Sequence, residues 1–175
     1  IGFIGQGYVG ENYADDFEQR GFSVIRYSLE EPHVRNKDRI QEAGVVFIAV
    51  PTPTTPDGFR LDILVEALTL PKPGAVVVIK STILPGTIER LQDQFSSLIL
   101  LFSPEFLREA TASEDARHPY SNIVGTPRDS EAHHAAARQV LDIMPKAAFE
   151  LICTSTEAEL KKYAAEQGFK PLFLL

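Results

Sequence analysis

The chain has 175 residues, of which 44 % are hydrophobic and 23 % are charged. This composition is ordinary for a globular protein and excludes an intrinsically disordered chain. The 24 acidic residues outnumber the 17 basic ones and give a net charge of −7, which argues against a nucleic-acid-binding surface because such surfaces are basic. No apolar run approaches the ~20 residues that a membrane-spanning helix needs, so we expect no membrane insertion.

The cysteine content limits the chemistry further. Cys153 is the single cysteine, so the sequence predicts no internal disulfide and no cysteine-based zinc cluster, and we expect no metal site. A chain without disulfides suits a reducing compartment, and the cytoplasm is the expected location. The sequence begins at Ile1 inside an apolar run, so we expect that residues precede it and that no signal peptide is present.

Short apolar segments alternate with segments of helical character along the chain. The sequence predicts strands at residues 1–4, 22–27, 45–50, 75–79, 98–102 and 121–124 and a last edge strand at 148–153. It predicts helices at residues 8–20, 38–43, 62–70, 87–95, 129–142 and 156–167, the last with Thr154 or Ser155 as its N-cap. Continuous apolar strands joined by helices are typical of a parallel sheet covered on both faces. The predicted fold class is therefore α/β, a doubly wound and mainly parallel sheet with helices on both faces.

A glycine-rich turn lies between the first strand and the first helix. Gly5-Gln6-Gly7-Tyr8-Val9-Gly10 fits the pattern G-x-G-x-x-G. Gly5 permits the tight turn, Gly7 lets a pyrophosphate approach the backbone, and Gly10 lets helix and strand pack closely. The helix N-terminus then offers free N–H groups to the phosphates. This placement predicts a dinucleotide-binding turn of the Rossmann type; the alternative is a glycine turn without a ligand.

The second strand should end in an acidic residue that binds the adenine ribose. Ser28 stands at that position, and Glu30 and Glu31 follow slightly late. A serine recovers only part of the hydrogen bonding that a carboxylate gives to hydroxyl groups. Arg26 and Ser28 could instead receive a 2′-phosphate, so the expected cofactor is NAD with NADP as the alternative. Arg26 is otherwise interpreted as a solvated charge at a strand end.

A proline-rich segment follows the third strand. It runs Val50-Pro51-Thr52-Pro53-Thr54-Thr55-Pro56 and predicts a stiff loop. In open α/β sheets ligands bind at the carboxyl ends of the strands, so this loop is expected beside the ligand.

Four longer segments carry a family resemblance. They are Gly2–Gly10, Val46–Pro53, Lys80–Thr87 (KSTILPGT) and Ser103–Ala112 (SPEFLREATA). In sequence, order and spacing they resemble the N-terminal domain of the UDP-glucose/GDP-mannose dehydrogenase family across nearly the whole chain. That family oxidises the C6 alcohol of a nucleotide sugar to a carboxylate with two NAD molecules. The resemblance is strongest to the members that act on UDP-glucose, which implies a nucleotide-sugar substrate and a part in polysaccharide biosynthesis.

The resemblance implies roles for matching positions. Thr82 would hold the water or oxyanion near the reacting carbon, Glu105 would assist general-base work on water, and Glu109 would contact the cofactor and the water network. Lys162, in a segment similar to the start of the family's long helix, would stabilise oxyanion character. The implied cofactor contacts are Gly5, Gln6, Gly7, Tyr8, Val9, Gly10, Val50, Pro51, Thr52, Pro53, Ser81, Thr82 and Glu109, besides Arg26 and Ser28. The plainer interpretations are that Glu105 only caps a helix start and that Lys162 is a surface charge.

The chain also departs from the family pattern. The family's nucleophilic cysteine lies in a later segment that is absent here, and Cys153 is expected to be a packing residue. Glu166 stands where the family has an asparagine one turn after the lysine. We therefore expect a dinucleotide-binding domain at residues 1–153 and the start of the connecting helix at residues 154–175, without the central and C-terminal domains.

These departures leave three readings of the function. The chain is expected to be the NAD-binding part of a dehydrogenase and incomplete for catalysis alone. The family forms dimers largely through the long helix, so a homodimer through that incomplete helix is implied. The alternatives are a non-catalytic or truncated nucleotide-binding module and a β-hydroxyacid dehydrogenase-like oxidoreductase, against which the segment Ser103–Glu109 argues.

Overall fold

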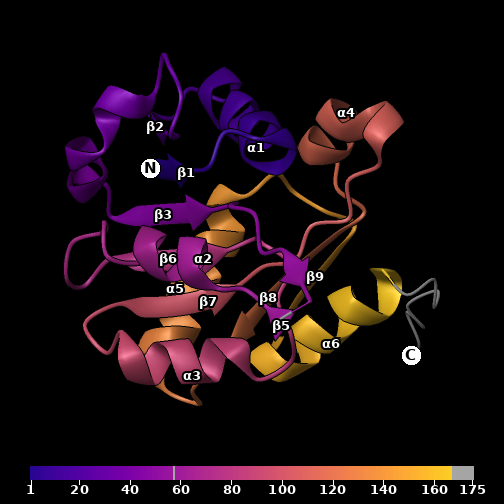
Figure 1. The fold of residues 1–175 in the computed structure, drawn as a ribbon. Helices are drawn as coiled ribbons and strands as arrows, with labels where there is room; N and C mark the ends of the chain where they lie inside the picture. The colour runs from indigo at the N-terminus through magenta and orange to yellow at the C-terminus, as the bar shows by residue number, and fades with distance from the viewer. Residues whose placement is uncertain (57, 167–175) are drawn as a thin grey trace.

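The computed structural model describes residues 1–56 and 58–166, with the side chains there except those of Glu109 and Glu166. The strands of its main sheet are β1 (Gly2–Ile4), β2 (Ile25–Tyr27), β3 (Val45–Ile48), β6 (Val76–Ile79), β7 (Ile99–Phe102), β8 (Ser121–Thr126) and β9 (Phe149–Thr154). Their order across the sheet is β2-β1-β3-β6-β7-β8-β9 (Figure 1). Neighbouring strands are parallel except β7 and β8, which are antiparallel with Phe102 opposite Gly125.

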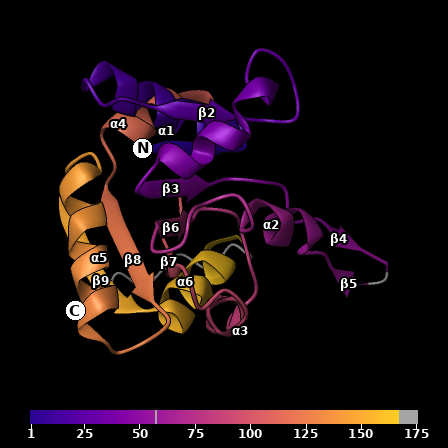
Figure 2. The same ribbon diagram turned by 90° about the vertical axis from the view of Figure 1, so that its left-hand side faces the viewer.

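Helices cover both faces of the sheet (Figure 2). One face carries α1 (Tyr8–Gln19), α4 (Ala112–Arg117) and α5 (Glu131–Ile143). The other carries the 3₁₀ helix η2 (Asp38–Glu42), α2 (Asp62–Ala67), α3 (Thr87–Gln94) and α6 (Ser155–Glu166). Two short 3₁₀ helices, η1 (Val34–Asn36) and η3 (Glu109–Thr111), lie in connections. The predicted doubly wound, mainly parallel α/β fold of the Rossmann type is confirmed.

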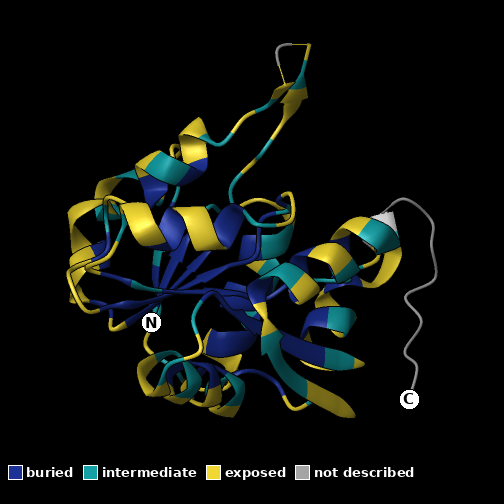
Figure 3. Cartoon of the chain, turned by 90° about the horizontal axis from the view of Figure 1, so that it is seen from below, coloured by how far each residue is buried: buried dark blue, intermediate teal, exposed yellow. Residues whose placement is uncertain are grey.

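The two faces of the sheet have separate apolar cores because successive side chains of a strand point to opposite faces. In β3, Val46 and Ile48 pack with α2 and α3, whereas Val45 and Phe47 pack with α1. All four of these side chains are buried. Figure 3 shows the buried strands between outer helices whose far sides are exposed. Burial on both faces explains the uninterrupted apolar runs of the sequence.

The structure corrects several predicted elements. The strand predicted at residues 22–27 is shorter, because Phe22 still belongs to the turn that leaves α1 and donates its N–H to the Phe17 carbonyl 3.0 Å away. The segment at residues 38–43 is the 3₁₀ helix η2 instead of an α-helix. The pairing of β8 with β7 is antiparallel, a direction that the apolar pattern of a strand does not encode.

The proline-rich loop contains a small hairpin that the sequence analysis missed. Strand β4 (Thr54–Thr55) pairs in antiparallel register with β5 (Gly58–Phe59). Figures 2 and 3 show this hairpin projecting from the body of the molecule. The prolines around its first strand interrupt the alternation of apolar and polar residues from which a hairpin is predicted.

Helix α6 begins with a capping box. The Thr154 hydroxyl accepts the Glu157 N–H at 3.3 Å, and the Glu157 carboxylate accepts the Thr154 N–H at 2.9 Å. Of the two predicted N-caps, Thr154 therefore fills the role. Ala158, one turn later, is fully buried in the core, so α6 is anchored on the sheet domain. The predicted last residue of this helix, Gln167, and residues 168–175 lie outside the described residues.

Candidate functional site

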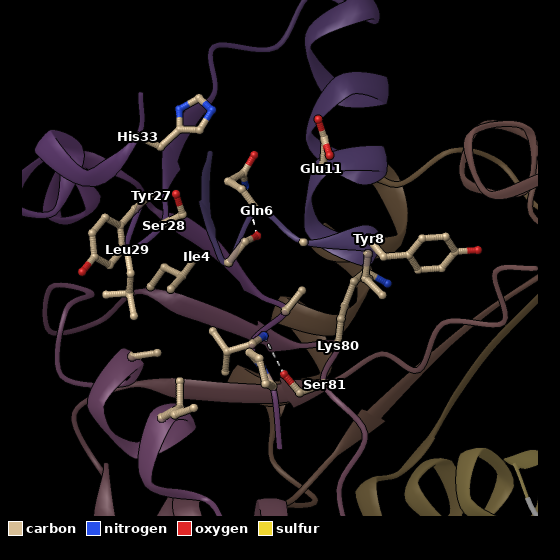
Figure 4. Close-up of a pocket in the computed structure, with 18 of the residues that line it drawn as sticks. Ile4, Gln6, Tyr8, Glu11, Tyr27, Ser28, Leu29, His33, Lys80 and Ser81 are labelled. Carbon is tan, nitrogen blue, oxygen red and sulfur yellow. Dashed lines mark hydrogen bonds between the residues drawn. The ribbon is translucent and has the colours of Figure 1, made fainter. Parts of the chain in front are cut away.

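A cavity of about 790 Å³ lies at the carboxyl ends of β1, β2, β3 and β6 (Figure 4). This volume is in the range of sites for organic ligands and cofactors. The edge of the sheet is the one where doubly wound folds bind dinucleotides. The predicted contacts that line it are Gly5, Gln6, Gly7, Tyr8, Val9, Ser28, Val50, Pro51, Thr52, Ser81, Thr82 and Glu105. Most of the predicted cofactor contacts therefore lie together at one site.

The glycine turn has the shape that a pyrophosphate requires. Gly5 has φ +89, and a Cβ on it would overlap the Ala49 carbonyl oxygen. A Cβ on Gly10 would overlap the Gly5 carbonyl oxygen, so Gly10 packs the turn against the helix and lies behind the cavity wall. A Cβ placed on Gly7 would have no heavy atom within 4 Å. Gly7 is also the N-cap of α1, and no side chain caps that end of the helix. The first N–H groups of α1 are therefore available to a phosphate, and the turn fits a dinucleotide.

The end of the cavity beside β2 carries the ribose candidates. Ser28 lines it with Glu30, Glu31 and His33. The Ser28 hydroxyl donates to the Glu30 carbonyl at 3.0 Å and accepts the Glu30 N–H at 3.4 Å. Ser28 thus forms a turn with Glu30, and the acidic groups at this end of the cavity are the carboxylates of Glu30 and of Glu31, the latter paired with Arg35 at 3.2 Å.

Arg26 is not one of the described residues that line the cavity. Its Nη2 lies 2.7 Å from Asp15 Oδ1 and 2.8 Å from Glu18 Oε2, both on α1. Its Nη1 reaches Gln6 Oε1 at 3.5 Å. The guanidinium charge is therefore matched by two carboxylates, and the structure does not bring Arg26 to the site where a 2′-phosphate was expected. The interpretation of Arg26 as a solvated charge is also wrong, because its side chain is 12 % exposed.

Two hydrogen bonds tie the loops after β3 and β6 together. The Val50 N–H donates to Ser81 Oγ at 2.9 Å, and Thr52 Oγ1 donates to the Thr82 carbonyl at 2.6 Å. Pro53 lies outside the lining, where its carbonyl accepts the Arg60 N–H at the base of the hairpin. The linked loops form one wall of the cavity.

Glu105 lines the cavity and pairs with Lys162, which lies behind it and outside the lining. Lys162 Nζ donates to Glu105 Oε1 and to the Glu105 carbonyl, each at 2.8 Å. The side chain of Lys162 is 8 % exposed and that of Glu105 is 12 % exposed. Lys162 is therefore not a surface charge. Nor does Glu105 cap a helix, because it lies in an irregular segment and the next helix, η3, begins at Glu109. The Glu109 side chain is outside the described part of the chain.

Lys80 is the residue that sequence analysis missed. It follows β6, lines the cavity and is 2 % exposed. Its Nζ lies 3.3 Å from the Ser103 carbonyl, 3.4 Å from Ser103 Oγ and 4.1 Å from the centre of the Tyr13 ring. Burial lowers the pKa of Lys80 to about 7, the Glu105 charge opposes that shift and the Lys162 charge adds to it. The signal in the sequence is a lysine directly after the four apolar residues of a buried strand. Because lysine is almost never fully buried unless it is paired, a lysine at such a position indicates a functional site.

A second cavity of about 490 Å³ adjoins the first. Glu105 lines both, and Tyr13, Phe106, His118 and Tyr120 line the second. A ligand in the second cavity would contact Glu105 as well.

Within residues 1–56 and 58–166, no helix is long and apolar enough to cross a membrane. Across the same residues, no three side chains of His, Cys, Asp or Glu gather closely enough to hold a metal ion.

Known proteins are similar to this chain in sequence and in fold. The model of the NAD binding domain of the UDP-glucose/GDP-mannose dehydrogenase family matches residues 31–143. The UDP-glucose 6-dehydrogenase AglM of Haloferax volcanii is 26 % identical over 215 residues, which cover 94 % of this chain and 50 % of that protein. The chain spans half or less of the length of the curated relatives it matches.

Solved structures agree with the sequence comparison. A UDP-glucose dehydrogenase of Pyrobaculum islandicum is 26 % identical with a TM-score of 0.79, over 94 % of this chain and 48 % of that one. A GDP-mannose dehydrogenase of Pseudomonas aeruginosa, 22 % identical, shares the fold with a TM-score of 0.79, over 96 % of this chain and 49 % of that one. From the glycine turn, the cavity and these matches it follows that the chain belongs to the UDP-glucose/GDP-mannose dehydrogenase family, as its NAD-binding domain.

Proposed function

We propose that the chain is the NAD-binding part of a UDP-glucose 6-dehydrogenase that oxidises the C6 alcohol of UDP-glucose to the carboxylate of UDP-glucuronate. The balanced reaction takes one alcohol, one water and two NAD⁺ to one carboxylate, two NADH and three protons. Relatives with the name UDP-glucose 6-dehydrogenase support this substrate. The proposal includes a cytoplasmic location, a part in polysaccharide biosynthesis, a homodimer, and the division into residues 1–153 and 154–175.

The observation that carries the proposal is the Glu105–Lys162 pair at the end of the dinucleotide cavity, where Thr82 also lines the wall. Bound NAD accepts a hydride at its nicotinamide ring. Lys162 holds a positive charge and N–H donors where an alkoxide or oxyanion would form, and such a donor stabilises that charge most in a site sheltered from water. Glu105 offers a carboxylate that can take a proton from the substrate hydroxyl or from water.

The second oxidation of this reaction needs water or a thiol to attack an aldehyde. Cys153 does not suit that role. It lies on β9, is half-buried, and burial raises the pKa of its thiol, so the reactive thiolate is disfavoured. The nucleophile of the second step is therefore assigned to parts of the enzyme other than this thiol. The same observation favours the second candidate function, a nucleotide-binding module without catalysis.

The experiment has two arms. NADH binding to the purified protein is followed by fluorescence, and NADH formation is followed at 340 nm with UDP-glucose, GDP-mannose or UDP-N-acetylmannosamine in the intact polypeptide that carries this chain. Fastest turnover with UDP-glucose supports the proposal, and fastest turnover with another sugar assigns a different substrate. Binding of NADH without any turnover would support the second candidate function, a nucleotide-binding module without catalysis.

A pair of variants tests the role of Glu105. Glu105→Gln should lower kcat by about 100-fold, the range in which general bases contribute, with little change in NADH affinity. Glu131→Gln, at an exposed carboxylate on α5, is the control and should keep full activity. Equal activity of the two variants would contradict the assigned role of Glu105.

A further inference from the structure

Among the described side chains, no carboxylate contacts the buried ammonium group of Lys80. Every polar contact that the described residues give its ammonium group is neutral: the Ser103 carbonyl, Ser103 Oγ and the face of Tyr13. A buried ammonium normally pairs with a carboxylate, because removing it from water is costly. Here the neighbouring carboxylate, Glu105, is already paired with Lys162 at 2.8 Å. The lysine is therefore the unbalanced charge of the cluster.

Three charged groups, Lys80, Glu105 and Lys162, form a cluster here. Glu105 and Lys162 cancel as an ion pair, so these three groups together carry a net charge of +1 when Lys80 is protonated and of zero when Lys80 is neutral. The Lys80 side chain runs from the end of β6 toward the first turn of α1 and lines the cavity beside Ser81 (Figure 4). The unbalanced charge thus faces the half of the cavity opposite the ribose candidates at Ser28.

The two redox forms of the cofactor differ by one charge at the nicotinamide ring, which is positive in NAD⁺ and neutral in NADH. In doubly wound folds the two mononucleotide halves bind on either side of the glycine turn, so the nicotinamide half occupies the Ser81 end when the adenosine half lies at Ser28. We infer that Lys80 sets the redox preference of the site: its buried ammonium repels the oxidised ring and shifts binding toward NADH. The inference rests on the proposed orientation of the cofactor in this cavity.

The pH dependence of the preference follows from burial. Burial lowers the pKa of Lys80 to about 7, so the cluster changes from +1 to zero as the pH rises through neutrality. Among the described residues, the charges that act on Lys80 are Glu105 after β7 and Lys162 on α6, and its ammonium group lies over the ring of Tyr13 on α1. Asp16 on α1 and Asp115 on α4 act in turn on Tyr13. Burial raises the pKa of Tyr13, so the phenol stays neutral throughout. Preference for NADH should therefore be largest at pH 6 and fade by pH 8.5.

The test is the ratio of two dissociation constants, for NAD⁺ and for NADH, measured by calorimetry on the purified protein. A ratio removes every effect on the phosphates, the ribose and the adenine, because both ligands share them. In wild type the ratio of the Kd of NAD⁺ to that of NADH should fall by about fivefold or more from pH 6 to pH 8.5. Lys80→Met, which replaces the stem with an apolar chain of similar length, should lower the ratio about as much at pH 6 and make it independent of pH.

Lys146→Met removes an exposed lysine, 67 % accessible, and should leave the wild-type ratio and its pH dependence intact. A wild-type ratio that does not change with pH overturns the inference, even if Lys80→Met does not fold. An unchanged ratio in folded Lys80→Met overturns it as well. Failure of wild type to bind either form of the cofactor overturns both the inference and the proposed function, whereas binding with an invariant ratio overturns the inference alone.

Discussion

Lys162 on α6 holds Glu105 by two contacts at once, since its Nζ lies 2.8 Å from both the carboxylate Oε1 and the backbone carbonyl of that residue. The contact joins positions 57 residues apart in the chain. Glu105 Oε2 also accepts the Leu107 N–H at 2.7 Å. The carboxylate is thus fixed in direction, and the irregular segment after β7 is fastened to α6.

Lys162→Met should lower the free energy of unfolding by about 3 kcal/mol, because it leaves the Glu105 carboxylate buried and without its cation. Urea denaturation at pH 7 measures the change. Lys146→Met, at an exposed site, should change stability by less than about 0.5 kcal/mol. Equal stability of wild type and Lys162→Met would mean that the ion pair contributes nothing to the fold.

Glu159 on α6 caps a different helix. Its buried carboxylate accepts the N–H groups of Gly86 at 2.6 Å and Ile88 at 2.8 Å, at the start of α3. Burial raises the pKa of Glu159 against the lowering effect of these hydrogen bonds. The native state therefore binds the proton more tightly than the unfolded chain, and the contribution of Glu159 to stability is lost as the pH rises through the raised pKa.

Glu159→Gln removes this titration. Relative to wild type, the variant should become more stable step by step as the pH is raised from 4.5 to 8, since only wild type must ionise a buried carboxyl. Urea denaturation of both proteins across this range gives the difference directly. A difference that stays constant with pH, or that moves the other way, would show that the two N–H groups outweigh burial. The control is Glu131→Gln, at an exposed carboxylate on α5. Glu157 is also exposed, but it caps α6 and is therefore unsuitable.

Features that consecutive residues encode were predicted correctly. The turn from Gly5 to Gly10 was predicted because its steric demands fall on consecutive residues, and the two-faced core followed from the apolar runs. Contacts between different helices and strands were not predicted. Arg26 is bound by Asp15 and Glu18, which are spaced one turn apart on α1 and face β2 only after packing. Lys80 contacts Tyr13 and Ser103, which belong to other parts of the fold. No sequence pattern around position 80 predicts either contact.

Two glycines of the turn should respond differently to the same added methyl group. Gly7→Ala adds a Cβ with no neighbour within 4 Å at an N-cap whose backbone is extended, with φ −87, so the melting temperature should stay within about 2 °C of wild type. The Cβ would stand where a pyrophosphate approaches the backbone, so the affinity for NADH should fall at least about tenfold. Calorimetric titration and thermal melting of the same sample test both parts.

Gly10→Ala is the matched comparison. Its Cβ would overlap the Gly5 carbonyl oxygen, so the turn and α1 must separate and the free energy of unfolding should fall by about 2 kcal/mol. Lower stability in Gly10→Ala with unchanged stability in Gly7→Ala assigns Gly10 to packing and Gly7 to the ligand. Undiminished NADH binding in Gly7→Ala would mean that the phosphates do not approach this backbone.

Selection of NAD over NADP should depend on the two carboxylates that hold Arg26. In wild type the guanidinium is matched by Asp15 and Glu18, while Glu30 and Glu31 line the cavity and would repel a 2′-phosphate. NADPH should therefore bind at least about tenfold more weakly than NADH.

The double variant Asp15→Asn, Glu18→Gln keeps the shape of both side chains and releases the charge of Arg26, which already reaches Gln6 at the cavity. Its affinity for NADPH should rise about fivefold or more, with the affinity for NADH nearly unchanged. The third change Arg26→Met in the same background should cancel the gain, because it removes the charge that was released. Kd values for NADPH and NADH at fixed ionic strength test the series. A gain that survives Arg26→Met would assign the effect to the lost carboxylates alone, and no gain at all would place Arg26 out of reach of the ribose.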